Sequence, residues 1–125
     1  MQDIVISFAA ILGGTAVILG AFGAHVLQSK LTIDQLHSLE TAIRYQMFHA
    51  LALLWCGSSL SWEDSLSVAL TCCFVVGILL FSGSIYGLIY LGYKQKPKKF
   101  LGPITPLGGL FLIVGWVLLG LKYLL

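Results

Sequence analysis

Two histidines of this chain, His25 and His49, lie within apolar stretches, where an ionisable ring is a candidate for ligand binding. Imidazole nitrogens ligate haem iron and form hydrogen bonds to quinones. Counted along a helix, His25 lies roughly 7 to 8 Å from Lys30, and His49 lies a similar distance from Arg44. If the two stretches form adjacent antiparallel helices in a membrane, both rings stand at one depth. A haem or quinone site is therefore one interpretation.

Three further polar residues precede His49 in the motif ETAIRYQMFHALAL. Glu40 stands four residues before Arg44, the favourable order for a helical ion pair, and Tyr45 stands four residues before His49. Arg44 and the histidines together suit an anionic headgroup or a quinone. The competing interpretation gives each polar side chain one hydrogen bond in a packed bundle. Because paired intramembrane histidines are common without a cofactor, we expect no haem and no other cofactor.

Hydroxyl groups follow in the second half of the chain, in the motifs LFSGSIYG and GPITPLGG. With the residues above they define a candidate polar site of His25, Glu40, Arg44, Tyr45, His49, Ser82, Ser84 and Thr105. The sequence has no nucleophile–base pair, no phosphate-binding loop and no metal-ligand spacing, and its cysteines lack the C-x-x-C pattern. We therefore predict no catalytic residue, no metal and no enzymatic activity.

The elements that carry these residues are membrane helices. Hydrophobic residues make up 58% of the 125 residues and the mean hydropathy is +0.97. Charged residues make up 10%, against about 25% in soluble domains. Four uncharged segments approach or exceed the ~20 residues that cross hydrocarbon: 4–29, 45–62, 65–93 and 100–121. The predicted fold class is all-α, a four-transmembrane-helix bundle that forms a single domain over residues 1–125.

A separate amphipathic pattern covers residues 32–44, between the first two spans. Apolar residues recur there at spacings of three and four, and polar residues fill the other face. Thr32 and Gln35 have the spacing of a capping box at its start. We predict an amphipathic interfacial helix on the cytoplasmic surface that bends into the second span near Arg44. The pair of Glu40 and Arg44 is expected to fix this bend.

Small residues at every fourth position predict close helix packing. The candidate packing residues are Ala16, Gly20, Ala24, Gly83, Gly87 and Gly109. The first three lie on one face of the first span, and the last of them directly precedes His25. We therefore expect the His25 side chain to point between helices and to join an interhelical hydrogen-bond network in the cytoplasmic half.

Basic residues set the predicted orientation. With alternating spans, six of the seven lysines and arginines fall in the first and third loops, which the positive-inside rule places in the cytoplasm. Both termini are then outside, and we expect a multi-pass protein of a bacterial plasma membrane. A net charge of only +2 gives no case for nucleic-acid binding. The expected partner is the lipid bilayer, and a homo-oligomer or a partner in a membrane complex is left open.

Four motifs in order, GAFGAH, ETAIRYQMFHALAL, LFSGSIY and GPITPLGG followed by GW, cover about Gly13 to Trp116. With them the chain resembles the YgdD/YwdK family of small four-helix membrane proteins (domain of unknown function 423), which includes the eukaryotic transmembrane protein 256. The resemblance implies a four-helix membrane fold and a membrane location. It implies no catalytic residue and no ligand.

Three functions fit these features. The first, which we favour, is a non-enzymatic membrane protein with a structural role or an accessory role in a membrane complex. The second is a membrane-embedded protein that binds a ligand or cofactor, such as a quinone, haem or a lipid headgroup. The third is a small oligomeric transporter. We rank it last because residues 4–24 and 65–93 have no Asp, Glu, Lys, Arg or His near the midplane.

Overall fold

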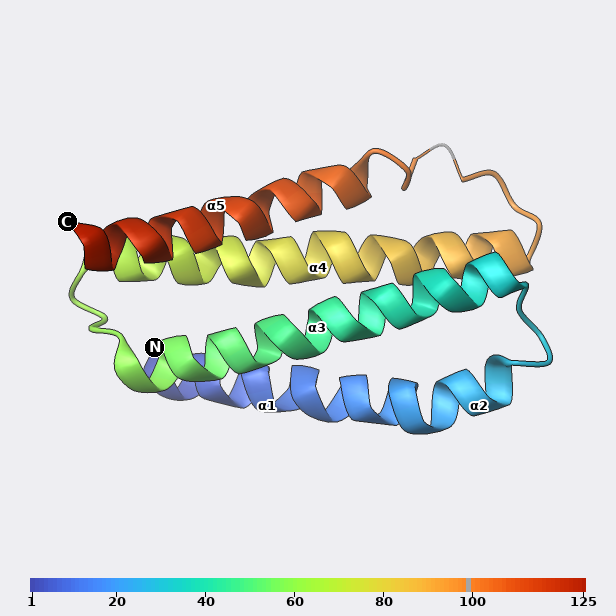
Figure 1. The fold of residues 1–125 in the computed structure, drawn as a ribbon, viewed down its shortest axis with the longest axis horizontal. Helices are drawn as coiled ribbons and strands as arrows, with labels where there is room; N and C mark the ends of the chain where they lie inside the picture. The colour runs from blue at the N-terminus through green and yellow to red at the C-terminus, as the bar shows by residue number, and fades with distance from the viewer. Residues whose placement is uncertain (99) are drawn as a thin grey trace.

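The computed structural model describes residues 1–98 and 100–125, apart from the side chain of Ala24. Within these residues the chain is all-α and has no strand. Its helices are α1 (Gln2–Ile18), the π-helical turn η1 (Leu19–Gly23), α2 (Ala24–Leu27), α3 (Ile33–Ser59), α4 (Ser65–Tyr93) and α5 (Ile104–Leu124). Successive long helices are antiparallel, so both termini lie at one end (Figure 1). α1 packs on α3, α3 on α4, and α4 on α5.

In the described residues, three helical segments are long and apolar enough to cross a membrane, judged by length and composition. These are Gln2–Leu27, which runs through η1, and the helices α4 and α5. Large apolar side chains on their outer surfaces, such as Ile11, Leu79 and Val117, are more than half exposed. Exposed apolar surface of this extent suits contact with lipid. α3 has a similar length, but charged residues occupy its first half, and it is not one of the three.

α3 is one continuous helix, so the predicted bend near Arg44 between an interfacial helix and a span is wrong. The predicted capping box at its start is confirmed. Gln35 N donates to Thr32 Oγ1 (3.2 Å), and Thr32 N donates to Gln35 Oε1 (3.0 Å). The helix does not bend because no Gly or Pro interrupts residues 33–56, and its buried stripe continues unbroken from Leu39 onward.

Two side-chain hydrogen bonds align α4 with its neighbours α3 and α5. Ser82 Oγ of α4 donates to the Ala42 carbonyl of α3 (2.8 Å), and Ser84 Oγ lies 2.5 Å from Thr105 Oγ1 at the start of α5. Because α4 continues for nine residues beyond Ser84, its last turns extend roughly 13 Å past the start of α5. Figure 1 shows α3 beside this extension and α2 on the other side of α3. We call this part of the bundle, residues 24–27, 33–41 and 85–93, the overhang.

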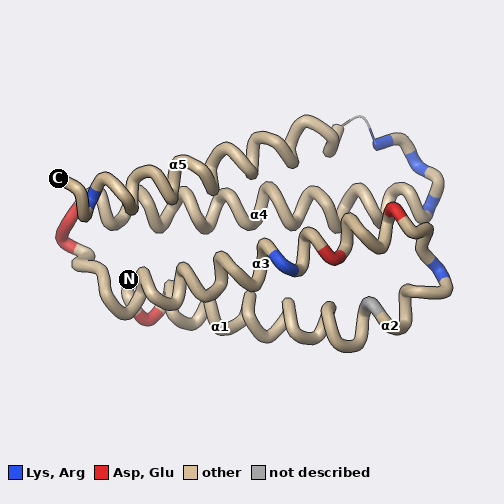
Figure 2. The backbone as a smooth tube through the Cα atoms, viewed as in Figure 1, with Lys and Arg blue, Asp and Glu red and all other residues tan. Residues whose placement is uncertain are grey.

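Figure 2 shows lysines clustered at one end of the bundle, while acidic residues lie at the other end and on the first half of α3, which carries Asp34, Glu40 and Arg44. At the end of the overhang lie four described lysines: Lys30, Lys94, Lys96 and Lys98. Lys99, which was counted with them from the sequence, lies outside the described residues. At the opposite end lie Asp3, Glu63, Asp64 and Lys122. The bundle therefore has a basic end and an acidic end.

Asp64 closes the acidic end. Its carboxylate caps α4 by accepting from Leu66 N (3.1 Å) and Ser67 Oγ (2.9 Å), and it forms an ion pair with Lys122 of α5. The hydrogen bond from Lys122, followed by those from Ser67 and Leu66, lowers the pKa of Asp64 to about 2. Asp64 therefore stays ionised throughout the physiological pH range, and it ties the α3–α4 connection to the end of α5.

Glycines bring α4 and α5 close together. A Cβ on Gly108 would lie 2.3 Å from the backbone nitrogen of Phe81, and one on Gly77 would lie 2.5 Å from Leu112 Cδ2. A Cβ on Gly115 would meet an aromatic ring of α4 at 2.7 Å. None of these three glycines is among the predicted packing residues. The closest helix contact in the bundle was therefore not found from the small-residue pattern.

The predicted packing residues have different surroundings. Ala16 is 1% exposed. Added Cβ atoms on Gly20 and Gly109 would make ordinary contacts at 3.6 and 3.7 Å, and one on Gly87 would meet a leucine side chain at 2.7 Å. The side chain of Ala24 lies outside the described residues.

Gly83 faces open space, and a Cβ added there would meet nothing within 4 Å. The predicted packing role of Gly83 is therefore wrong. The reason is that α4 meets α5 along the line through Gly77, Phe81 and Ser84, which follows helical spacing. Gly83 lies outside this line and points away from the partner helix.

Gly108, in the contact, and Gly83, outside it, provide a matched test of the α4–α5 contact. We expect Gly108→Ala to lower the free energy of unfolding by about 1 to 3 kcal/mol, because the new methyl group would collide with backbone and the helices would have to separate. Gly83→Ala should be neutral or stabilise by up to about 1 kcal/mol, because alanine is the better helix former. Unfolding of both variants in mild detergent measures the difference, and equal stability would contradict the close contact.

Candidate functional site

The amide of Gln46 lies at the centre of the buried polar contacts. The residue is 4% exposed. Its Nε2 donates to the Leu12 carbonyl (2.9 Å) and to Thr15 Oγ1 (2.9 Å), both on α1. Its Oε1 accepts from the hydroxyl of Tyr86 on α4 (2.6 Å). One side chain of α3 therefore holds two neighbouring helices.

His49 makes the corresponding link to α5. Its ring is buried, and Nδ1 lies 2.8 Å from the Tyr45 carbonyl, which can only accept. Nδ1 therefore carries the proton, and Nε2 is free to accept from the indole N–H of Trp116 at 3.1 Å. Trp116 and Phe74 pack against the ring, with centroids 6.0 and 5.7 Å from it. The geometry describes a neutral imidazole whose two nitrogens both have partners.

Four of the eight predicted site residues lie in the interior contacts between helices. These are His49, Ser82, Ser84 and Thr105. Ser84 also donates to the Phe81 carbonyl (2.9 Å), within its own helix. All three hydroxyls therefore contribute to helix register, and the structure brings none of them into a pocket with a histidine.

The other predicted residues lie on the outside. Arg44 Nη2 lies 3.4 Å from Glu40 Oε1, and the two side chains are 57% and 65% exposed. The pair therefore lies on the surface of a continuous helix and does not fix the predicted bend. Tyr45 is 41% exposed, and its ring lies against Phe81 with centroids 4.8 Å apart. Exposed ion pairs of this spacing contribute only about 0.3 to 0.5 kcal/mol.

His25 is also exposed, and its ring has no hydrogen-bond partner among the described residues. The prediction that it joins an interhelical network with His49 is wrong. His25 instead lines a groove of about 480 Å³ with Glu40 and Leu36 of α3. His49 lies nine residues further along α3 than Glu40, roughly 13 Å, so the two rings are not at one level.

Four residues of the network are not among the predicted site residues: Gln46, Thr15, Tyr86 and Trp116. A signal for Gln46 was present, since it lies four residues from both Ala42 and Ala50 and three from His49, on the stripe that the structure buries. No sequence signal distinguishes Thr15 or Trp116. Which of the polar residues on neighbouring helices meet depends on the helix register.

The chemistry available to this site is limited. No group of three His, Cys, Asp or Glu side chains that could hold a metal occurs in the part of the chain that the structure describes. In the same part, the buried side-chain nitrogen without a partner is Nε1 of Trp62, in the α3–α4 connection at the acidic end. The interior polar groups therefore act on one another.

The two tyrosines near this network allow a direct test. Tyr86→Phe removes the hydroxyl that donates to Gln46, so we expect the free energy of unfolding to fall by about 0.5 to 1.5 kcal/mol. Tyr45→Phe removes a hydroxyl with no hydrogen bond among the described residues and should change stability by less than about 0.5 kcal/mol. Unfolding in detergent compares them. Equal values for the two variants would show that the Gln46 contact does not stabilise the bundle.

Comparison with known proteins supports a membrane protein and names no activity. A family model described as "Protein of unknown function (DUF423)" matches residues 19–109. The chain is 44% identical over 101 residues to a UPF0382 membrane protein of Staphylococcus aureus (strain bovine RF122 / ET3-1), and these residues make up 80% of this chain and 78% of the relative. It is 40% identical over 115 residues to the UPF0382 membrane protein YwdK of Bacillus subtilis (strain 168), covering 87% and 89% of the two chains.

A eukaryotic relative extends this group. The chain is 39% identical over 115 residues to a UPF0382 membrane protein of Schizosaccharomyces pombe, covering 86% of this chain and 91% of the relative. No solved structure shows significant similarity to the chain. The resemblance noted from the four sequence motifs is confirmed: the chain belongs to the DUF423 family of UPF0382 membrane proteins.

Proposed function

We propose that this protein is a non-enzymatic, multi-pass membrane protein that serves as a structural or accessory component of a membrane complex. The observation that carries the proposal is that the polar groups of Gln46 and His49 in the interior form hydrogen bonds within the protein. The amide of Gln46 has three partners, and each ring nitrogen of His49 has one. In a low-dielectric interior such bonds are costly to break, so a satisfied group offers little to a ligand.

The same geometry argues against haem at His49. Axial ligation uses the electron pair of a ring nitrogen. Nδ1 of His49 carries a proton, and the electron pair of Nε2 accepts from Trp116. Ligation would leave the indole N–H of Trp116 without its partner. His25 cannot complete a pair of axial ligands across the helices, because it lies beside Glu40 and not beside His49.

We also propose that α3 is the fourth span, from about Tyr45 to its end. This segment has no charged residue and lies between α1 and α4, both of which are long and apolar enough to cross a membrane. The start of α5 at the level of Ser84 supports a bilayer boundary there, because α5 alone is about 31 Å long, the thickness of the hydrocarbon core. The overhang then begins at the edge of the hydrocarbon core and runs through the headgroup region, and it is part of a single domain over residues 1–125.

The charges support an orientation. The four described lysines at the end of the overhang outnumber Asp34 and Glu40 on its α3 segment, and three of the five acids lie at the opposite end. The positive-inside rule therefore favours a cytoplasmic overhang with both termini outside. We propose the bacterial plasma membrane as the location. Exposed apolar side chains such as Phe48, Leu51 and Trp116 leave a flank where lipid, a second copy or a helix of a larger complex can pack.

Two variants of His49 separate a structural role from ligand binding. A glutamine at this position can still donate to the Tyr45 carbonyl and accept from Trp116, so His49→Gln should keep most of the stability. His49→Leu should lose about 1 to 2 kcal/mol of unfolding free energy, because the indole N–H loses its acceptor. The wild-type protein purified in mild detergent should show no Soret band and release no quinone on extraction. A stoichiometric chromophore that disappears in His49→Gln would overturn the structural role.

Orientation has its own test. Tags at Met1 and at Leu125 should both be accessible from outside intact cells, while a tag inserted after Lys96 should be reached only after permeabilisation. Protection of both terminal tags would reverse the proposed orientation. Protection of one of them alone would show an odd number of spans and would exclude α3 as the fourth.

A further inference from the structure

A groove of about 570 Å³ opens in the overhang, where the described residues of α2 and α4 do not contact each other and α3 lies at the side. Its walls are apolar: Leu19 of η1, Leu27 of α2 and Leu39 of α3 face the side chains of α4. Among the described residues, no backbone contact joins α1, η1 or α2 to α4, so only side chains line the space between them. A volume of this size is typical of pockets that hold small hydrophobic ligands.

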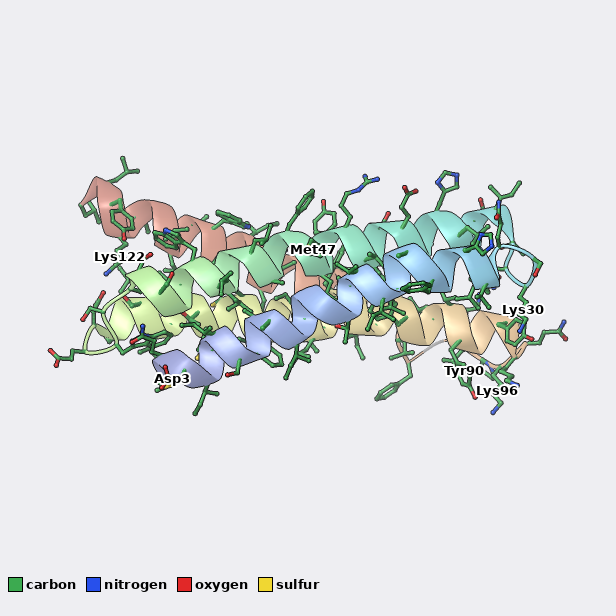
Figure 3. The ribbon with its side chains drawn as sticks, turned by 90° about the horizontal axis from the view of Figure 1, so that it is seen from below. Asp3, Lys30, Met47, Tyr90, Lys96 and Lys122 are labelled. Atoms are coloured by element: carbon green, nitrogen blue, oxygen red, sulfur yellow. The ribbon has the colours of Figure 1, made fainter. Side chains whose placement is uncertain are left out.

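The polar groups of this groove gather at its outer end. Lys30 follows α2 and Lys94 follows α4, so the two ammonium groups come from opposite walls. Lys94 Nζ lies over the Tyr93 ring, 5.6 Å from its centroid, and Tyr90 completes the rim. Figure 3 shows Lys30 and Tyr90 together at this end of the molecule. Neither lysine belongs to an ion pair in residues 1–98 and 100–125.

The neighbouring grooves differ in charge. The groove beside His25 contains Glu40, and the groove between α3 and the 94–103 connection contains Asp34 with Lys98. A fourth groove, at Trp55 and Trp116, has no charged residue. Of these four grooves, the one at Lys30 and Lys94 combines two cations with no acid.

We propose that this groove binds an acidic phospholipid of the surrounding bilayer, with one acyl chain between α2 and α4 and the phosphate between Lys30 and Lys94. The groove is complementary to such a lipid. It is apolar toward the bundle, where the acyl chain would lie, and cationic at the outer end, where the phosphate would lie. Tyr90 and Tyr93 lie beyond Ser84 on α4, on the headgroup side of the proposed hydrocarbon boundary, where aromatic side chains are enriched. Basic pockets between membrane helices bind anionic headgroups, and no acidic residue among the described residues that line this groove pairs with Lys30 or Lys94.

The test titrates the 125-residue protein in mild detergent with dioleoylphosphatidylglycerol or dioleoylphosphatidylcholine and counts bound lipid by native mass spectrometry. We expect the wild type to prefer the acidic lipid by about tenfold or more. Lys30→Gln with Lys94→Gln should abolish the preference. The matched control, Lys96→Gln with Lys98→Gln, removes the same charge from the same end but outside the groove and should change the preference by less than about twofold.

A second variant separates the groove from the charges. Leu27→Trp fills the apolar part and leaves both lysines in place, so it should weaken binding of the acidic lipid about tenfold while the thermal unfolding of the protein is kept. Equal binding of the two lipids by the wild type, an equal loss in both lysine variants, or unchanged binding in Leu27→Trp would overturn the proposal. His49→Gln should leave lipid binding unchanged, so failure of the structural role proposed above would be distinguishable.

Discussion

The amide of Gln46 is the contact on which the placement of the helices depends. Hydrocarbon offers no hydrogen bonds, so a buried amide in a membrane bundle has to find its partners in the protein. The donors and acceptor of Gln46 are satisfied only when α1 presents Leu12 and Thr15 and α4 presents Tyr86. Any axial shift or rotation of one helix would leave a polar group without a partner. This requirement favours one register over the many that apolar packing alone would allow.

Different forces hold the two sides of the bundle. On the side of α3, hydrogen bonds of Gln46, His49 and Ser82 connect the helices. Between α4 and α5, glycine permits backbone approach, and Gly108 lies against the Phe81 backbone. Since lipid is as apolar as the side chains, close packing and interhelical hydrogen bonds take the place of the hydrophobic effect in both cases.

The two ends of the molecule differ in the same physical terms. At the acidic end, Asp64 caps α4 and pairs with Lys122, so its charge is fully used within the fold. At the basic end, α3 and α4 extend past α5, and Lys30 and Lys94 face a groove with no acid on its walls. The first end is closed by its own interactions. The second presents charge and apolar surface that the described part of the chain does not neutralise or cover.

Local properties of the sequence were enough for the all-α class, the limits of α4, the start of α3 and the separation of charge. Each depends on composition, periodicity or a cap within a few residues. The continuity of α3 was missed because its charged first half resembles a surface helix, and its packing on α4 is a long-range contact. Likewise, the spacing of His25 and His49 suggested a pair, but the positions of α2 and α3 place the rings at different levels.

The sequence by itself determined that this chain forms long apolar helices with a basic and an acidic end, because hydropathy and charge are properties of each segment. Only the tertiary structure decided that Gln46, and not His25 or Arg44, links the helices. It also decided that Gly108, and not Gly83, lies in the closest contact. The physical reason is that a side chain's partner depends on the rotation and axial shift of two helices. These are set jointly by all the contacts between them.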